Sequence, residues 1–255
     1  MNNPASEEEI IDYIEELERQ NEFKSELIST SSHQMRTSLT ANKWAISMLL
    51  NGDSGPINEE QRKLLSKIAE NNGQMIASVS ELIDINHTEE THPRYNFEPL
   101  NLHDLIVDVI EDFHAESSEK DIAVSFEETG ENHILIGDKQ KIKTVFQALI
   151  ENALKYSHEG GSIMIHTETG EDEVVISVKD EGIGIPESEQ SSIFQKFYRA
   201  KNAQKEHSIG SGLGLFSAAH VIQAHGGNIW FDSEEGSGST FYISIPFPPE
   251  EVIVE

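Results

Sequence analysis

The feature that most restricts how this chain can fold is a helical pattern over residues 6–88 that is broken once. A mostly apolar stripe, which includes Met35, Leu39 and Ile46, recurs at alternating steps of four and three residues. The segment NGDSGPIN, residues 51–58, contains two glycines and a proline and is expected to end the first helix. The sequence therefore predicts an antiparallel helical hairpin. Because a lone hairpin buries little apolar surface, we expect two copies to pair in a dimeric four-helix bundle.

The first 22 residues carry the same spacing in a strongly acidic context. Ile10, Ile14 and Leu17 follow it, whereas the polar Asn21 weakens it. Such a stripe fits either an amphipathic helix packed on its own domain or a parallel two-stranded coiled coil. We favour the second and assign residues 1–22 to a coiled-coil linker.

The pattern changes at THPRYNFEPLN, residues 91–101, which has two prolines and no clean period. Beyond it, strand-like runs alternate with helical patterns. The expected strands are IAVSFEE, HILIG, SIMIHTE, EVVISVKD, NIWFDS and STFYISIP, and the expected helices are 102–113, 139–156 and 211–225. This order predicts an α/β two-layer sandwich. The domains are therefore placed as a hairpin at 23–90, a linker at 91–97, the α/β domain at 98–249 and a tail at 250–255.

The charge of the chain limits the partners that it can have. Its 255 residues include 46 acidic side chains against 18 lysines and arginines, which gives a net charge of −28. Such a surface repels phosphate backbones and anionic membranes, so nucleic-acid and lipid partners are not expected. A polyanionic ligand would need a metal counter-ion or local basic residues.

Other features of the composition narrow the class further. The chain has no cysteine, which excludes disulfides and thiolate metal sites. No apolar run approaches the ~20 residues that span a bilayer, and no secretory signal peptide is recognisable. We therefore expect a soluble, cytoplasmic molecule.

Four short stretches in the α/β half contain residues that suit ligand chemistry: ENALKYS (151–157), DEGIGI (180–185), GSGLGLF (210–216) and GSGSTF (236–241). Asp180 ends an expected strand, where its carboxylate can accept a hydrogen bond from an exocyclic amine. The glycines that follow let backbone approach a ligand, and SGLGL opens a helix whose N-terminal amides suit a phosphate. Each stretch alone fits a turn or a packing site, but turns alone do not explain all four in this order.

Asn152 and Lys155 are three residues apart and therefore share one face of an expected helix. An amide oxygen can coordinate Mg²⁺, and a lysine can neutralise phosphate in this acidic protein. The alternative is that both are ordinary polar residues of a helix surface.

Together these stretches resemble the N box and glycine boxes of the Bergerat ATP-binding fold, and IFQKFYRA (193–200) resembles its F box. That fold is shared by sensor histidine kinases, type II topoisomerases, the Hsp90 chaperone and MutL. The addition of SSHQMRTSLT (31–40) makes the chain similar only to the histidine kinases. In these, a HisKA-type dimerisation and phosphoacceptor hairpin precedes the catalytic ATP-binding domain. The resemblance spans roughly residues 20–248.

The resemblance implies a nucleotide site for ATP with Mg²⁺. Asn152 would ligate the metal and Lys155 would contact phosphate. Tyr156 would pack on the nucleotide, and Asp180 would hydrogen-bond adenine. Arg199 would either reach phosphate or make a surface salt bridge.

The glycines would shape this site. Gly182 and Gly184 would line the adenine pocket. The hinge of a lid and its phosphate-binding turn would be formed by Gly210, Gly212 and Gly214, with Leu213 between the last two. The lid itself would run over about residues 199–208, which are polar and expected to be mobile.

In the helical half, His33 corresponds to the phosphoacceptor of the family, whose imidazole would attack the γ-phosphoryl group of ATP. Gln34 stands where many members have an acidic residue. An amide can orient the ring but cannot accept its proton, which predicts a slower autokinase. Thr37 shares the helix face of His33 and would help to hold the water that hydrolyses a phosphorylated partner.

Three further positions matter for comparison with the family. Ser38 replaces a usual proline, so we expect the helix to bend less easily. Ala148 replaces a frequent asparagine, which predicts altered Mg·ATP binding. Trp44 falls near the face of His33, where it could meet a docking partner, although packing on the second helix is favoured slightly.

The leading interpretation is the core of an ATP-dependent protein histidine kinase that passes phosphate from His33 to an aspartate of a response regulator receiver domain. It would act as a homodimer below an upstream sensor domain or a separate sensor partner, with residues 1–22 as the signalling linker. One alternative is a weakened relative that works mainly as a regulator phosphatase or scaffold. Another is a Bergerat ATPase that acts as a conformational clamp.

Overall fold

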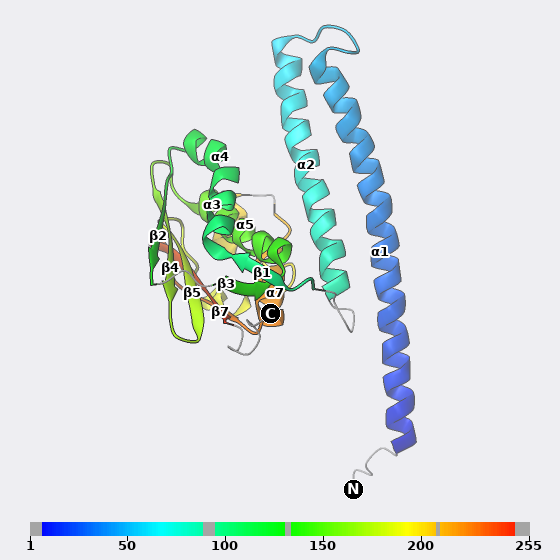
Figure 1. The fold of residues 1–255 in the computed structure, drawn as a ribbon. Coiled ribbons are helices and arrows are strands. Elements are labelled where there is room, and N and C mark those ends of the chain that lie inside the picture. The colour runs from blue at the N-terminus through cyan, green and yellow to red at the C-terminus, as the bar shows by residue number, and fades with distance from the viewer. Residues whose placement is uncertain (1–6, 89–94, 131–133, 208–209, 248–255) are drawn as a thin grey trace. The chain divides into compact units, whose positions relative to one another are not determined.

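The computed structural model describes residues 7–88, 95–130, 134–207 and 210–247. The chain divides into two compact units, residues 1–93 and 94–255 (Figure 1). Among the helices in the described ranges, none combines the length and the apolar character that a membrane span requires.

The first unit is a hairpin of two antiparallel helices, α1 (Glu7–Asn51) and α2 (Glu59–Thr88) (Figure 1). The predicted break between them is confirmed. Gly52 and Gly55 in the turn have φ angles of 85° and 110°, which residues with a side chain rarely adopt.

The start of α2 is fixed by a reciprocal pair of hydrogen bonds. The side chain of Asn58 accepts from the backbone N–H of Gln61 at 2.8 Å, and the side chain of Gln61 accepts from the N–H of Asn58 at 2.9 Å. This is a capping box, which satisfies two backbone donors that a helix start would leave unpaired. The sequence NEEQ therefore sets where the second helix begins.

Polar side chains cross between the two helices of the hairpin. Asn72 is only 5% exposed, and its amide donates to the carbonyl of Leu39 at 2.9 Å. The guanidinium of Arg36 donates to the hydroxyl of Ser80 at 3.2 Å. Because a buried amide is costly unless it is hydrogen-bonded, these contacts favour one register of α1 against α2.

One face of the hairpin leaves large apolar side chains uncovered. Besides Trp44, the large apolar side chains that are more than a third exposed are Phe23, Leu27, Met35 and Leu49 on α1 and Leu64, Ile68 and Met75 on α2. Exposed apolar surface of this kind marks an interaction face. The dimeric bundle stays a prediction, and this face is where a second copy would pack.

The slight preference for Trp44 packing on the second helix was wrong. Its side chain is 69% exposed. Eleven residues separate it from His33, which is about 20° away from three full turns at 3.6 residues per turn. The indole therefore projects from the same side of α1 as the histidine, away from α2.

The second unit contains a five-stranded sheet in the order β2-β4-β5-β7-β6. The strands are β2 (Ala123–Thr129), β4 (Ser162–Thr169), β5 (Glu173–Asp180), β6 (Asn228–Glu234) and β7 (Gly238–Pro246). β2 runs parallel to β4, and the other neighbouring pairs are antiparallel. A separate antiparallel pair is formed by β1 (Glu98–Asn101) and β3 (Ile134–Gly137).

Helices cover one face of this sheet (Figure 1). The three longer helices of this unit are α3 (Leu102–Asp112), α5 (Lys139–Tyr156) and α7 (Gly214–Ala224). The unit also contains the short helices α4 (His114–Glu119) and α6 (Lys201–Glu206) and the 3₁₀ helix η1 (Glu187–Ser192). The predicted combination of a helical hairpin with an α/β two-layer sandwich is confirmed.

The core lies between the sheet and α3, α5 and α7. The inward residues of β5 alternate along the strand as Val174, Ile176 and Val178, each at most 3% exposed. The polar Asp180 continues this inward series, at the end of the strand. The alternation that buries the core therefore also carries a carboxylate to the rim of the sheet.

Two differences from the predicted elements lie next to each other in the chain. The helix expected at 211–225 begins at Gly214, because Gly212 has a φ of 69° that no right-handed helix accommodates. Residues 201–206, expected to be part of a mobile lid, form the helix α6.

Candidate functional site

Asp180 is a buried carboxyl at the end of the central strand β5. It is 6% exposed, and its Oδ1 accepts from the backbone N–H groups of Gly182 at 2.9 Å and Ser239 at 3.3 Å. Burial raises the pKa of Asp180 to about 6, although the two backbone donors act in the opposite direction. A carboxylate held in this way is a directional acceptor with little freedom to turn.

The glycines after Asp180 are required by the protein's own backbone. A Cβ on Gly182 would lie 2.2 Å from the carbonyl oxygen of Tyr156, and one on Gly184 would lie 1.9 Å from that of Glu234. The loop is tied to the end of α5 by the N–H of Ile183, which donates to the Tyr156 carbonyl at 3.1 Å. The sequence reading assigned these glycines to a ligand, whereas the immediate reason for them is this close packing of chain on chain.

The last turns of α5 present Asn152, Lys155 and Tyr156, all half-buried. The Lys155 Nζ lies 5.6 Å from the centre of the Tyr156 ring. Burial lowers the pKa of the Lys155 ammonium, and the neighbouring Arg199 lowers it further. Two cations are thus held near each other in a chain whose net charge is −28.

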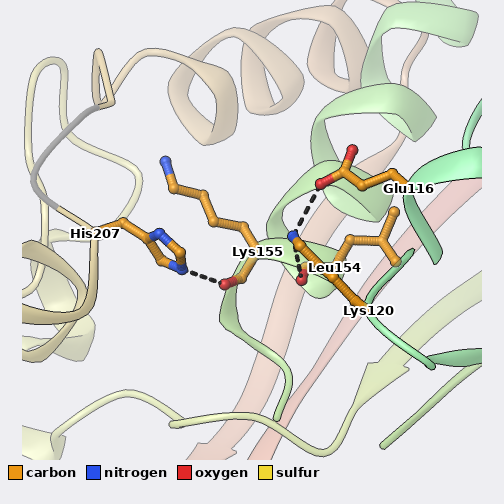
Figure 2. A network of polar contacts seen from close by, with 5 residues as sticks. All are labelled: Glu116, Lys120, Leu154, Lys155 and His207. Carbon is orange, nitrogen blue, oxygen red and sulfur yellow. Dashed lines mark hydrogen bonds and ion pairs between the residues drawn. The ribbon is translucent and has the colours of Figure 1, made fainter. Parts of the chain in front are cut away.

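Arg199 is turned onto the segment that contains α6. Its guanidinium donates to the carbonyl of Ala203 at 3.3 Å and to that of His207. The ring of His207 in turn donates through Nε2 to the carbonyl of Lys155 at 2.6 Å. Figure 2 shows this imidazole reaching the end of α5 from the opposite side to Lys120.

The third glycine stretch passes beside these cations. A Cβ on Gly210 would lie 3.1 Å from the Lys155 Nζ and 3.3 Å from the Arg199 guanidinium carbon. Gly212 packs on the F box, since its Cβ would lie 2.7 Å from the backbone of Phe197, whose N–H donates to the Gly212 carbonyl at 3.0 Å. Gly210 therefore places its backbone directly beside the Lys155 ammonium and the Arg199 guanidinium.

Leu213 and Gly214 complete this stretch. Leu213 is 2% exposed and precedes the first turn of α7. A Cβ on Gly214 would make an ordinary 3.6 Å contact with the Cβ of Ala148 on α5. The small residue at 148 therefore packs against the start of α7.

The remaining predicted residues lie in the helical unit. His33, Gln34 and Thr37 are all exposed on α1, and the hydroxyl of Thr37 donates to the carbonyl of His33 at 2.9 Å. Ser38 makes the equivalent bond to Gln34 at 3.1 Å, and α1 runs through this region as one helix. The imidazole of His33 is thus presented to solvent on a continuous helix.

Two residues that contact the end of α5 were not singled out from the sequence. His207 falls in the stretch read as a lid, and Lys120 directly follows the short helix α4, which the sequence did not predict. Lys120 donates to the carbonyl of Leu154 at 3.0 Å, across 34 residues of sequence. No local pattern signals a contact of this kind, because it depends on how α4 packs on α5.

Comparison with known proteins assigns both units to described families. Residues 23–91 match the family "His Kinase A (phospho-acceptor) domain", and residues 137–249 match "Histidine kinase-, DNA gyrase B-, and HSP90-like ATPase". The sensor histidine kinase WalK of Bacillus subtilis (strain 168) is 31% identical over 255 aligned residues, which cover 93% of this chain. The chain spans 39% of the length of that relative.

Solved structures agree with these matches. The catalytic domain of the histidine kinase ThkA is 33% identical with a TM-score of 0.54, and the likeness covers 60% of this chain and 99% of that one. ThkA in complex with the response regulator protein TrrA is 25% identical with a TM-score of 0.64, over 98% of this chain and 69% of that one.

Proposed function

This chain belongs to the histidine kinase family, and we propose that it is an ATP-dependent protein histidine kinase core that phosphorylates its own His33. The observation that carries the proposal is the presence in one chain of two matched parts. One is an exposed histidine on the helix of a phosphoacceptor domain, and the other is an ATPase domain with a cation-lined glycine stretch.

The proposed reaction is an in-line displacement at the γ-phosphorus of ATP. A bond forms between an imidazole nitrogen of His33 and phosphorus, the bond from phosphorus to the bridging oxygen breaks, and ADP leaves. The ring sheds its other proton to water as the phosphoramidate forms. The attacking nitrogen is the unprotonated one, whose lone pair forms the bond to phosphorus. Gln34, as an amide, orients the ring without accepting that proton.

The ATP end of the reaction is assigned to the second unit. Asp180 would accept from the exocyclic amine of adenine, and Tyr156 would pack on the nucleotide between the loop of Gly182 and Gly184 and the end of α5. Lys155 and Arg199 would offset the phosphate charge beside Gly210. The neighbouring Gly212, Leu213 and Gly214 would form the turn that opens α7, whose N-terminal amides suit a phosphate.

Magnesium fits the donor set on this side of α5. Mg²⁺ keeps several waters and is usually held by one or two protein oxygens together with substrate phosphates. The half-buried amide of Asn152 is such an oxygen donor, one turn before Lys155. When bound, the ion would neutralise charge on the β- and γ-phosphates.

The partners of the helical unit follow from its exposed faces. The apolar face of α1 and α2 supports a homodimer, with residues 23–90 as its bundle and 1–22 as a coiled-coil signalling linker. The side of α1 that carries His33 and the exposed Trp44 would receive the receiver domain of a response regulator, as a complex of that kind is known for ThkA. Thr37, on the same side, would help to hold water against the phosphorylated regulator.

The domain bounds, the location and the upstream control of the kinase core are also proposals. Residues 91–97 would link the bundle to the catalytic domain at 98–249, followed by a tail at 250–255. We infer a cytoplasmic location and control by a sensor domain or a separate sensor protein.

Incubation with γ-³²P-labelled ATP and Mg²⁺ tests the proposal. The wild-type chain should gain a label that is lost in acid and kept in base, as expected for a phosphoramidate. His33→Ala should gain none, and Asn152→Ala should gain much less. Labelling that persists in His33→Ala, in a protein whose helix content is unchanged, would overturn the assignment of His33.

A further inference from the structure

The C-terminal end of α5 is held from two sides by side chains of other elements. A helix leaves its last carbonyl groups without partners inside the helix. Here the carbonyl of Leu154 accepts from Lys120 Nζ at 3.0 Å, and the next carbonyl, of Lys155, accepts from His207 Nε2 at 2.6 Å (Figure 2). The two donors come from opposite directions along the chain.

Lys120 contacts the end of α5 from the side on which α4 lies. Its ammonium also pairs with Glu116 one turn earlier, at 2.9 Å, and its side chain is 32% exposed. A cation beside the last carbonyls of a helix is favoured by the helix dipole. Glu116 fixes where that cation lies and offsets its charge, so α4 and α5 are joined by a directed contact.

His207 contacts the end of α5 from the segment that was expected to form the lid. Its ring meets that of Tyr156 edge-on, with centroids 5.8 Å apart and planes at 69°. Its own carbonyl accepts from Arg199. One residue thus connects the backbone of Lys155, the ring of Tyr156 and the guanidinium of Arg199.

We propose that Lys120 and His207 are positioning residues for Lys155, which fix the last turn of α5 so that the Lys155 ammonium and Arg199 face the phosphates together. This inference rests on the proposed function, because it assumes that Lys155 contacts phosphate. The side chain of Lys155 leaves from the last turn of a helix, where ends ordinarily fray. Capping both carbonyls removes that freedom from the backbone on which the ammonium is mounted.

The two positioning residues lie in different parts of the domain. Lys120 belongs to the folded body of the domain, whereas His207 directly follows α6 in the segment between Arg199 and the glycine stretch. His207 therefore makes the placement of Lys155 depend on where that segment lies. Its contact ties the residue that follows α6 to the backbone of Lys155.

The test compares a ligand with phosphates to one without. Dissociation constants of the full-length variants are measured for Mg·ATP and for adenosine by displacement of a fluorescent ATP analogue. Loss of one hydrogen bond of this kind corresponds to about a fivefold change. We expect His207→Ala and Lys120→Met each to weaken ATP about fivefold and to leave adenosine unchanged. His207→Gln, whose amide nitrogen reaches a similar place to Nε2, should stay within about twofold of the wild type.

Matched controls are available on the same elements. Lys143→Met removes the ion pair of another α5 lysine, which lies 2.8 Å from Asp112 and far from the end of the helix. Lys205→Ala removes an exposed lysine of α6. Both should bind ATP as the wild type does.

A double-mutant cycle decides whether the effect passes through Lys155. In the Lys155→Met background, His207→Ala and Lys120→Met should cost no further ATP affinity, because the group that they position is absent. The proposal is overturned if ATP and adenosine weaken equally, if neither weakens, or if the losses add in the Lys155→Met background. A wild-type chain that binds no ATP would instead overturn the proposed function.

Discussion

At the scale of single residues, Asp180 couples stability to pH. Its folded pKa of about 6 lies above the ordinary value of 3.8, so the folded state holds the proton more tightly than the unfolded one. The stability that this contributes is complete below about 3.8 and is lost as pH rises through about 6. At neutral pH the buried charge then costs roughly 3 kcal/mol, at 1.36 kcal/mol per pKa unit.

The variant Asp180→Asn separates the stability cost of the buried charge from the proposed role of Asp180 in binding adenine. The Asn Oδ1 can keep the two backbone hydrogen bonds, so the variant should be up to roughly 3 kcal/mol more stable at pH 8 and little changed at pH 4. The amide NH₂ would then face the adenine amine, donor against donor, and ATP affinity should fall at least tenfold. Thermal unfolding at both pH values and ATP titration measure the two effects. A variant that is less stable at pH 8, or that binds ATP normally, would contradict this account.

Gln34 offers a second residue-scale test. Gln34→Glu supplies a group that can accept the proton shed by the His33 ring, and general-base assistance typically contributes ~10²-fold or more. We expect faster autophosphorylation at saturating ATP with an unchanged KM for ATP. Gln34→Ala, which neither accepts a proton nor orients the ring, is the control. A rate that Glu does not raise would exclude proton acceptance as the limiting feature.

The sequence could predict those site residues whose roles depend on neighbours that are close in the chain. Asp180 was accessible because it ends an alternating strand and is followed by glycines. His207 and Lys120 were not, because their contacts with α5 cross 52 and 34 residues and arise only when the domain is packed. The need for glycine at 182 was predicted, but its cause, the carbonyl of Tyr156, is also a tertiary contact.

At the scale of elements, most strands and long helices followed from their periodicity, whereas the lid region did not. Strand β5 and helix α5 begin and end where alternation and helical spacing predicted. The start of α7 was displaced by Gly212, whose positive φ serves a contact with Phe197 that no spacing reveals. The short helix α6 lacks the length from which a period can be read.

The loop after β5 gives the test at this scale. Gly184 and Gly160 have similar φ angles, 60° and 75°, but only Gly184 has backbone where a Cβ would go. Gly160→Ala should cost about 1 kcal/mol, the left-handed backbone alone. Gly184→Ala should cost roughly 3 kcal/mol or more, because the chain at Glu234 must also move.

Urea unfolding can report on the second unit alone. The chain has two tryptophans, so a Trp44→Phe background leaves Trp230 on β6 as the only indole. Both glycine variants are compared in that background. Equal losses for Gly184→Ala and Gly160→Ala would show that the close approach to Glu234 carries no energetic weight.

At the scale of the whole molecule, the two units were predictable because each has its own period. The hairpin is read from steps of four and three, and the sandwich from alternation interleaved with helices. The dimer, unlike the two units, remains a prediction. The sequence predicts a dimer because a lone hairpin buries little apolar surface, and the hairpin leaves apolar side chains uncovered on both helices.

The uncovered apolar face of the hairpin can be tested at a single residue of α2. Ile68 on α2 is 43% exposed among Leu64 and Met75, where a second copy would bury it. Ile68→Lys would place a charge inside the bundle, which is costly without a paired acid. Sedimentation equilibrium should therefore give the wild type twice the mass of the chain and the variant the mass of one chain at micromolar concentration.

Ser66→Lys is the matched control, because it adds the same charge to an exposed position two residues earlier on the same helix. It should remain dimeric. Since residues two apart do not share a helix face, the pair separates the effect of the face from that of net charge. A dimeric Ile68→Lys variant, or a monomeric Ser66→Lys variant, would place the dimer contact elsewhere on the hairpin.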